Sequence, residues 1–358
     1  MKNNRGLPTP STFLDAGKEI FRGRRKTTRH QRALHKDLDL FRSFFGTWPC
    51  ICAEIWRRVN PTKTIDPKSK VKHLLWALFL MNNYAKESLN AAIAGVDEDT
   101  FRKWAMPWIP AISSITIELL DFNKRFEGNW HYWTFIVDGV HCPLNEPRRP
   151  FWKGWFSFKF HGAGLAYEIA TAVTTGHIIW VNGPYPASWP DWKIFKHKLA
   201  HLVRPDIEKG VCDAGYWWCS EWLYRPWWRT KQGLQKDLPR NDLHEYLRSR
   251  HEQTNGRITR WNCLSTKFRH DRNDHCNFFR AIVGIVQLEI QHGFAPQFNA
   301  IPDQWVAADP AQQCAATPDP DIDESYPTTL YGELRRILGV GQDNEPPMVQ
   351  YDPYSEFR

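Results

Sequence analysis

The pattern of apolar and polar positions changes character near residue 130 and divides the chain into two kinds of structure. From residue 37 to residue 125, apolar side chains recur with helical spacing. After residue 130 they alternate with polar ones or stand in short β-branched and aromatic runs, as in strands. The chain therefore predicts a helical region followed by an α/β region.

Two of the expected helices meet near Gly95, where a glycine permits the positive φ of a tight turn. On the second helix, Phe101 and Trp104 are expected to pack inward. Arg102 and Lys103 are expected to face outward, where a recognition helix would present them to the major groove of DNA. The pattern fits a helix-turn-helix, and an ordinary helical hairpin is the alternative.

The α/β region is expected to hold five strands and three helices. The strands are expected at 133–144, 151–162, 165–175, 177–184 and 208–217. The first helix is expected at 188–203, where Ser188 and Asp191 would form a capping box. A loop is expected at 220–241. The second helix is expected at 243–264, capped by Asp242, and the third at 275–293. This order predicts an α/β, RNase H-like domain, a mixed five-stranded sheet flanked by helices.

Charge is spread unevenly along the chain. The net charge is +8, yet residues 301–358 hold eleven Asp and Glu against three Lys and Arg. The basic remainder suits a polyanionic partner, usually nucleic acid, and a basic protein without that role is the alternative. The expected parts are a basic disordered arm at 1–36, the helical helix-turn-helix region at 37–125, the RNase H-like domain at 130–295 and an acidic Pro-rich tail at 301–358.

Cysteine spacing and hydropathy narrow the class of protein. The eight cysteines form no CxxC pair, and the basic first 36 residues do not read as a secretory signal. A reduced intracellular compartment with free thiols is therefore expected. No apolar run reaches the roughly 18 residues that a membrane span needs.

Three carboxylates stand where a metal site of this fold would need them. Asp138 lies inside a strong strand, Asp213 ends a second strand, and Glu252 lies on the polar face of a later helix. Together they would hold two Mg²⁺ ions about 3.5–4 Å apart on a phosphodiester. Glu245, seven residues before Glu252, shares its stripe of the helix and is the rival. Each acid alone is also explained as a turn or surface residue.

Five stretches carry a family resemblance over about residues 130–295. They are VDGVHCPLNEP, the stretch containing WVNGPYPASWPD, CDAGYW, RSRHEQTNGRITRW and FRHDRNDHCNFFRAI. The chain resembles the DDE superfamily endonucleases of PIF/Harbinger-type transposons. The resemblance implies an RNase H-like fold, two Mg²⁺ or Mn²⁺ ions, and cleavage and transfer of DNA strands.

The resemblance also assigns the site. It maps the triad onto Asp138, Asp213 and Glu252, the last preferred to Glu245 because of the residues around it. The chain departs from the family pattern at Val140, where the family often has a polar residue after Asp-Gly. The resemblance implies a nuclear protein that acts on transposon ends and target DNA as a homo-oligomer, with a Myb-like DNA-binding protein as an optional partner. A host-adopted DNA-binding protein without transposition activity is the alternative, and a phosphoesterase acting on RNA is a third reading.

Other residues near the expected site suit DNA. Basic side chains expected at DNA phosphates are Arg102, Lys103, Arg148, Arg149, Lys153, Lys159, Lys193, Arg250 and Arg257, with a solvated surface as the alternative for each. The dense tryptophans would stack on unpaired bases or, more simply, fill the core. His251 is expected to make a structural hydrogen bond. Cys263, His270, His275 and Cys276 fit no common zinc template.

Overall fold

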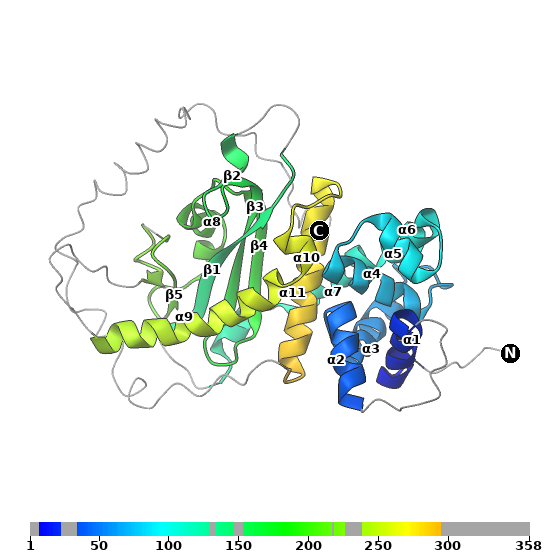
Figure 1. Cartoon of the computed structure of the whole chain (residues 1–358). Coiled ribbons are helices and arrows are strands. Elements are labelled where there is room, and N and C mark those ends of the chain that lie inside the picture. The colour runs from blue at the N-terminus through cyan, green and yellow to red at the C-terminus, as the bar shows by residue number, and fades with distance from the viewer. Residues whose placement is uncertain are drawn as a thin grey trace.

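The computed structural model describes residues 7–22, 34–128, 133–146, 153–216, 218–225 and 238–294, with backbone alone for Lys153 and residues 238–243. Figure 1 shows a helical region on one side, a sheet domain on the other and helix α11 between them. The expected strand at 151–162 and the basic arm lie partly outside the described residues, and the acidic tail lies wholly outside them.

The helical region consists of short helices around an apolar centre. They are α1 (Pro10–Arg22), α2 (Leu34–Phe45), α3 (Pro49–Val59), α4 (Val71–Asn83), α5 (Glu87–Ala94), α6 (Glu98–Ala105) and α7 (Trp108–Leu119), with the 3-10 turns η1 (Asn60–Thr62) and η2 (Phe122–Phe126). Helix α1 corrects the prediction of a disordered arm for residues 10–22. It is ordered because Phe13 and Leu14 are buried in the core that α2 and α3 also line.

The expected hairpin is formed by α5 and α6. Gly95 ends α5 with φ of 69°, and Asp97 begins α6 by accepting a hydrogen bond from the Thr100 amide at 2.8 Å. Phe101 is buried and Trp104 is partly buried, as expected. The two helices and their turn at Gly95 are therefore confirmed, while the helix-turn-helix assignment and a DNA-reading role for α6 stay predictions.

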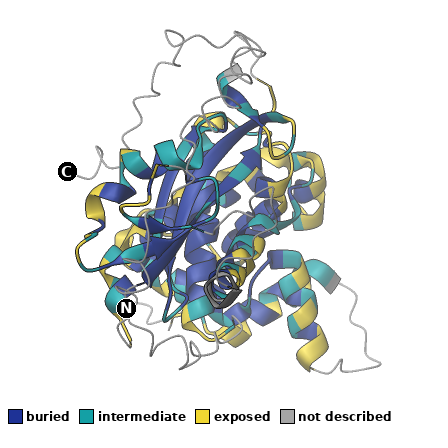
Figure 2. Cartoon of the chain, turned by 90° about the vertical axis from the view of Figure 1, so that its left-hand side faces the viewer, coloured by how far each residue is buried: buried dark blue, intermediate teal, exposed yellow. Residues whose placement is uncertain are grey.

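The sheet is mixed. Its strands are β1 (Trp133–Pro143), β2 (Phe156–Ser157), β3 (Gly162–Ala172), β4 (Ile178–Pro186), β5 (Lys209–Val211) and β6 (Leu223–Tyr224). The main path runs β4-β3-β1-β5-β6, with the two-residue β2 paired to the start of β3. Strand β1 is antiparallel to β3 and parallel to β5. The mixed sheet is thus confirmed and is consistent with the RNase H-like domain expected from the sequence, and Figure 2 shows its strands as the buried centre of the domain.

Three strand predictions need correction. The expected strand at 208–217 shortens to the three residues of β5, so Asp213 lies beyond its end. The expected strand at 151–162 shrinks to β2, because the 3-10 turn η3 (Lys153–Trp155) precedes it and a turn follows. The expected loop at 220–241 supplies β6, which pairs parallel to β5. A two-residue strand has too few alternating positions to be found by periodicity.

Helices cover both faces of the sheet. α8 (Asp191–His197) and the 3-10 turn η4 (Leu199–Leu202) pack on one face through Phe195 and Leu199. The other face carries α9 (Leu238–Thr259) and α11 (His275–Gln291), joined by α10 (Asn262–Ser265) and η5 (Arg272–Asp274). Figure 1 shows α8 and α11 on opposite sides of the strands.

Helix starts differ from the predictions. Pro190, and not Ser188, precedes α8, and no side chain caps this helix, so the expected capping box is wrong. α9 begins at Leu238, which places Asp242 inside the helix instead of at its cap. The expected helix at 243–264 is broken after Thr259, because Trp261 adopts extended backbone and starts α10.

One hydrophobic core joins the helical region to the sheet domain. Its members run from Phe13 of α1 to Tyr167 of β3 and Phe279 of α11, and the last two rings stack at 3.7 Å. α7 crosses α11 closely: a Cβ at Gly284 would lie 2.2 Å from Thr116 Oγ1. The helical region is therefore part of one packed body and not a separately packed unit.

Candidate active site

Asp138 is positioned by the alternation of β1. Phe135 and Val137 point toward α8, whereas Ile136 packs with the α9 side, so Asp138 faces α9 as Ile136 does. The amide of Gly139 donates to Asp138 Oδ1 at 2.7 Å, and Asn255 Nδ2 donates to its Oδ2 at 3.2 Å. A carboxylate in mid-strand is thus held by one backbone and one α9 contact.

Asp213 lies just beyond β5, the strand that runs parallel to β1. The amide of Gly215 donates to Asp213 Oδ1 at 2.8 Å. Burial raises the pKa of Asp213, and the nearby charge of Asp138 raises it further. The structure therefore brings together two of the three acids that the sequence singles out.

A third carboxylate at this site is Asp191, the first residue of α8. A Cβ at Gly139 would lie 2.2 Å from Asp191 Oδ1. A Cβ at Gly215 would lie 3.0 Å from Asp191 Oδ2 and 3.1 Å from Asp213 Oδ1. Two glycines therefore leave the space that the carboxylate fills. Sequence reasoning took Asp191 for a helix cap, although its place in the Pro-Asp motif was a signal for the site.

The negative charge of this cluster is only partly compensated by the nearby cations Lys159 and Arg248. Burial raises the pKa of Asp191 to about 6; Lys159 opposes this, while Asp213 and Asp138 add to it. Asp191 Oδ1 is buried without a hydrogen-bond partner in the described structure. Carboxylates crowded together with raised pKa values form a site that favours a bound cation.

Glu252, the third acid predicted from sequence, is not drawn into this cluster. Its side chain is 59% exposed and pairs with Arg248 at 3.0 Å. It nevertheless shares a stripe of α9 with Arg248 and Asn255, at i−4 and i+3. Asn255 binds Asp138, and Arg248 lowers the pKa of Asp213, so the stripe lies along the acids. The rival Glu245 is exposed on the same helix.

Comparison with known families decides the class of the domain. The family model described as DDE superfamily endonuclease matches residues 137–287. These residues form a DDE superfamily endonuclease domain. The match includes Asp138, Asp191, Asp213 and Glu252. No curated protein and no solved structure matches the chain.

DDE endonucleases use divalent metal ions, and the residues of this endonuclease domain fit such ions. Carboxylate oxygens are the hard ligands that Mg²⁺ and Mn²⁺ prefer. The unpartnered Oδ1 of Asp191 lies beside Asp213 and Asp138. Within the described residues, no three His, Cys, Asp or Glu side chains converge closely enough to hold an ion as they stand.

A second layer of buried polar groups lies behind the acids of the endonuclease domain. Burial raises the pKa of Glu168 on β3 to about 8; a hydrogen bond from Trp180 opposes this, and Asp191 adds to it. The Tyr216 hydroxyl is buried without a partner in the described structure, and Asp191 and Glu168 raise its pKa further after burial. Burial therefore favours the protonated, uncharged form of Glu168.

The predicted DNA contacts fall into different environments. Lys159 lies at the acids, where its Nζ donates to the Gly139 carbonyl at 2.9 Å. Arg250 is buried beside Tyr246, and Arg257 pairs with the buried Glu289, which gives both arginines packing roles instead of surface ones. Arg148 and Arg149 lie outside the described residues, as does the side chain of Lys153.

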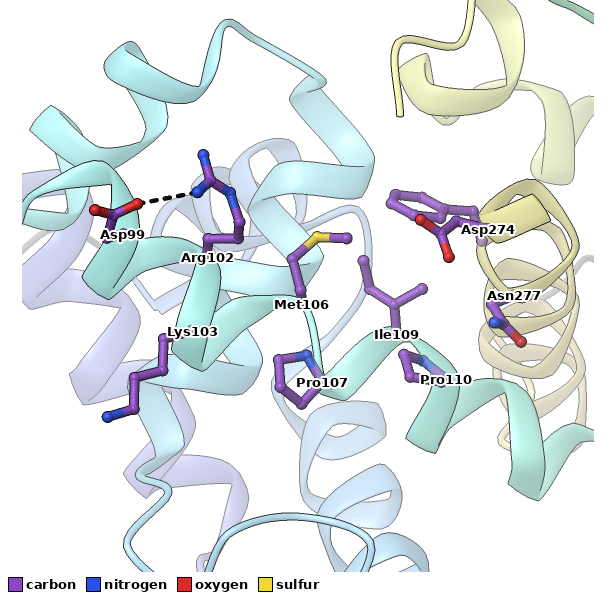
Figure 3. A pocket seen from close by; sticks show the side chains of 10 residues that line it. Asp99, Arg102, Lys103, Met106, Pro107, Ile109, Pro110, Asp274 and Asn277 are labelled. Carbon is purple, nitrogen blue, oxygen red and sulfur yellow. Dashed lines mark hydrogen bonds and ion pairs between the residues drawn. The ribbon is translucent and has the colours of Figure 1, made fainter. Parts of the chain in front are cut away.

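On α6 the predicted DNA contacts are compensated. Arg102 pairs with Glu87 and Asp99, and Lys103 lies over the Trp104 ring. A pocket of about 490 Å³ opens between this helix and α11. Figure 3 shows Arg102 joined to Asp99, with Met106 beside them. The pocket lining includes Asp99 and Asp274 but none of the clustered acids, so it is not the endonuclease site.

Remaining predictions concern single residues. His251 is buried and shares a hydrogen bond of 2.9 Å with Thr171, which confirms its structural role. Cys263, His270, His275 and Cys276, whose spacing fits no common zinc template, belong to no group of three metal-ligating side chains within the part of the chain that the structure describes. In the same part, no helix has the length and apolar character of a membrane span.

Proposed function

We propose that the chain is the metal-dependent DNA endonuclease and strand transferase of a cut-and-paste transposon of PIF/Harbinger type. The observation that carries the proposal is the carboxylate cluster inside a DDE superfamily endonuclease domain. Asp138, Asp213 and Glu252 would hold two Mg²⁺ or Mn²⁺ ions, and Asp191 would complete the anionic site. When bound, the ions lower the pKa of the attacking water and stabilise the leaving oxygen.

The reaction would proceed in two displacements at phosphorus. Water attacks the phosphate at the transposon end, the bond to the 3′ oxygen breaks, and a 3′-hydroxyl and a 5′-phosphate result. The 3′-hydroxyl then attacks a phosphate of the target DNA and displaces its 3′ oxygen. Lys159, which contacts the Gly139 carbonyl beside the acids, would stabilise the phosphate charge during both steps.

Glu252 must leave its ion pair with Arg248 to bind a metal ion. Because that pair is largely exposed, its contribution to stability is small, and breaking it costs about 0–1 kcal/mol. Arg248 would then be available to a DNA phosphate or to Asp213. The proposal further includes nuclear location, assembly of a homo-oligomer on two transposon ends, and an optional Myb-like partner.

The ion pair of Glu252 also favours a second candidate function. A host-adopted protein that binds DNA without cutting it would keep the fold, and an acid neutralised by Arg248 is what a non-catalytic site tolerates. The two functions differ in whether the intact chain cuts DNA.

The test measures nicking of duplex DNA that carries the terminal repeats, with Mg²⁺ or Mn²⁺. We expect wild type to cut, and Asp138→Asn, Asp213→Asn and Glu252→Gln each to lose roughly 100-fold in rate while still binding DNA. Glu245→Gln is the matched control on α9 and should cut normally. Binding without cutting by wild type, with or without a Myb-like partner, would favour the host-adopted function.

A further inference from the structure

A basic surface leads away from the acids along α8 and η4. The segment from Trp192 to Pro205 contains no Asp or Glu. Its cationic or titratable side chains are partly or fully exposed: Lys193, Lys196, His197, Lys198, His201 and Arg204. Because Asp191 starts α8 and lies beside Asp213, this surface begins at the clustered acids.

The apolar side of the same segment fixes it to the sheet. Phe195 and Leu199 are fully buried against β1 and β3, and Ile194 packs against Tyr185. The residues between them must therefore face away from the core. The sequence KIFKHKLAHLVR thus places its basic residues outward and its apolar residues inward, except for Leu202, which is 45% exposed.

Aromatic rings hold several of these cations in place. Lys193 Nζ lies 4.3 Å from the Trp189 ring centroid, and Lys196 Nζ lies 5.7 Å from that of Trp222. His197 Nδ1 shares a hydrogen bond of 2.9 Å with the Tyr185 hydroxyl. Side chains held in this way lose less conformational entropy when they bind a ligand than flexible side chains do.

The positive charges are close enough to affect one another. Burial lowers the pKa of His197, and Lys198, His201 and Lys193 lower it further. On α6, Arg102 is paired with two acids, and Glu98 and Asp99 are exposed beside it. The segment from Trp192 to Pro205 holds four Lys and Arg and no acid, so its net positive charge for a polyanion is larger than that of α6.

We propose that the basic face of α8 and η4, defined as Lys193, Lys196, His197, Lys198, His201 and Arg204, binds the sugar–phosphate backbone of duplex DNA next to the cleaved bond. This inference rests on the proposed function, because it needs DNA at the acids. Contacts of this kind position the duplex without reading its sequence.

The experiment compares two triple variants of the full chain. The first is Lys193→Gln, Lys196→Gln and Lys198→Gln, which removes charge and keeps a polar side chain. The matched control is Lys63→Gln, Lys68→Gln and Lys72→Gln, which removes the same charge from the exposed α3–α4 side of the helical region, where Lys72 also lies over a tryptophan ring. Thermal unfolding checks that both variants fold.

Duplex affinity is measured by fluorescence anisotropy at several KCl concentrations in EDTA, so that cutting does not contribute. We expect the α8 variant to lose about 10- to 100-fold in affinity at low salt, and its salt slope to fall by roughly 2 to 3, as three lost phosphate contacts require. The control variant should lose much less. The loss should be the same for unrelated DNA sequences.

Equal losses in both variants would show that net charge alone matters and would overturn the proposal. Loss of affinity for an RNA duplex but not for DNA would also overturn it. The nicking assay separates this inference from the proposed function. If wild type binds through α8 but does not cut, the surface stands and the nuclease proposal fails. If wild type cuts and the α8 variant binds DNA normally, the nuclease proposal stands and the proposed DNA-binding surface on α8 fails.

Discussion

Gly139 shows how a missing side chain shapes this site. The Asp191 carboxylate occupies the space where a Cβ at residue 139 would lie, at 2.2 Å from Oδ1. The stretch Asp138-Gly139 therefore does two things: the aspartate supplies one acid, and the glycine admits another from the opposite face of the strand.

Gly139→Ala should displace the Asp191 carboxylate. We expect a stability loss of about 1–3 kcal/mol from overpacking and a loss of Mg²⁺-induced stabilisation, measured by thermal unfolding with and without the ion. Gly256→Ala is the control, since a Cβ there meets nothing within 4 Å, and helix propensity predicts a gain of about 0.5–1 kcal/mol. Normal Mg²⁺ stabilisation in Gly139→Ala would contradict the close packing of Asp191.

Glu168 gives a prediction for pH. Its pKa is raised from 4.5 to about 8 by burial, so between these values the folded protein keeps a proton that the unfolded chain has lost. Its stabilising effect is complete below pH 4.5 and falls by about 1.4 kcal/mol per pH unit until pH passes 8. Glu168→Gln should remove this dependence and be more stable than wild type at pH 9 by a few kcal/mol.

Urea unfolding from pH 4 to pH 9 measures this difference. The two proteins should converge at the acid end of the range. Glu118→Gln, on the exposed side of α7, is the matched control and should follow wild type throughout. A constant offset between Glu168→Gln and wild type would mean that Glu168 does not stay protonated in the folded protein.

For single residues, the sequence correctly predicted that Asp138 and Asp213 are neighbours. An acid inside one strand and an acid at the end of another are expected to bring their carboxylates together at one edge of the sheet. The sequence missed Asp191, because a Pro-Asp at a helix start is explained equally well by capping. Only the empty space above two glycines, which lie far from it in sequence, distinguishes the two readings.

Among the elements, the contact between α7 and α11 depends on one glycine. Thr116 Oγ1 donates to the Arg280 carbonyl at 2.9 Å. A Cβ at Gly284 would lie 2.2 Å from the same Thr116 Oγ1. The two helices approach this closely only because residue 284 has no side chain.

Gly284→Ala should destabilise the protein by about 1–3 kcal/mol, since helix α11 must move away from α7. Thr116→Ala removes the oxygen and leaves the nearest remaining atom 3.3 Å from the new Cβ. The double variant should therefore lose less stability than the sum of the two single losses, as measured by denaturant unfolding. Additive losses would show that α7 and α11 do not meet at this point.

Periodicity predicted the long elements well and the short ones poorly. β1, β3, β4 and α11 lie close to their predicted bounds, because each has many residues on a consistent face. β2 and β6, with two residues each, owe their existence to β3 and β5 and carry no pattern of their own. The break before Trp261 follows from tertiary packing, since its ring fills the space over Gly46.

For the whole molecule, the continuous core predicts one cooperative unit. Buried residues from α1, α4 and α7 share a cluster with β3, α10 and α11. We expect a single calorimetric transition in which the calorimetric and van't Hoff enthalpies agree. Hydrogen exchange should give the amides of α4 and β3 the same global free energy of opening.

Trp261→Ala should shift that single transition as a whole, by about 3–5 kcal/mol in unfolding free energy, because the ring is fully buried between Gly46 and the sheet domain. Two resolved transitions, with only one moved by the substitution, would mean that the helical region folds on its own. The sequence predicted a boundary near residue 130 from the change in periodicity. It could not show that packing continues across that boundary.

The shared core also limits how this chain can be rearranged. α11 comes last among the described helices, yet its apolar residues face both the sheet and the helices that precede Asp138 in the chain. The helical region therefore cannot be exchanged on its own, because replacing it with the corresponding part of a distant relative would require matched changes along α11. Divergence in this lineage should occur as coupled substitutions in two distant stretches, and successful chimeras should carry α7 and α11 from the same parent.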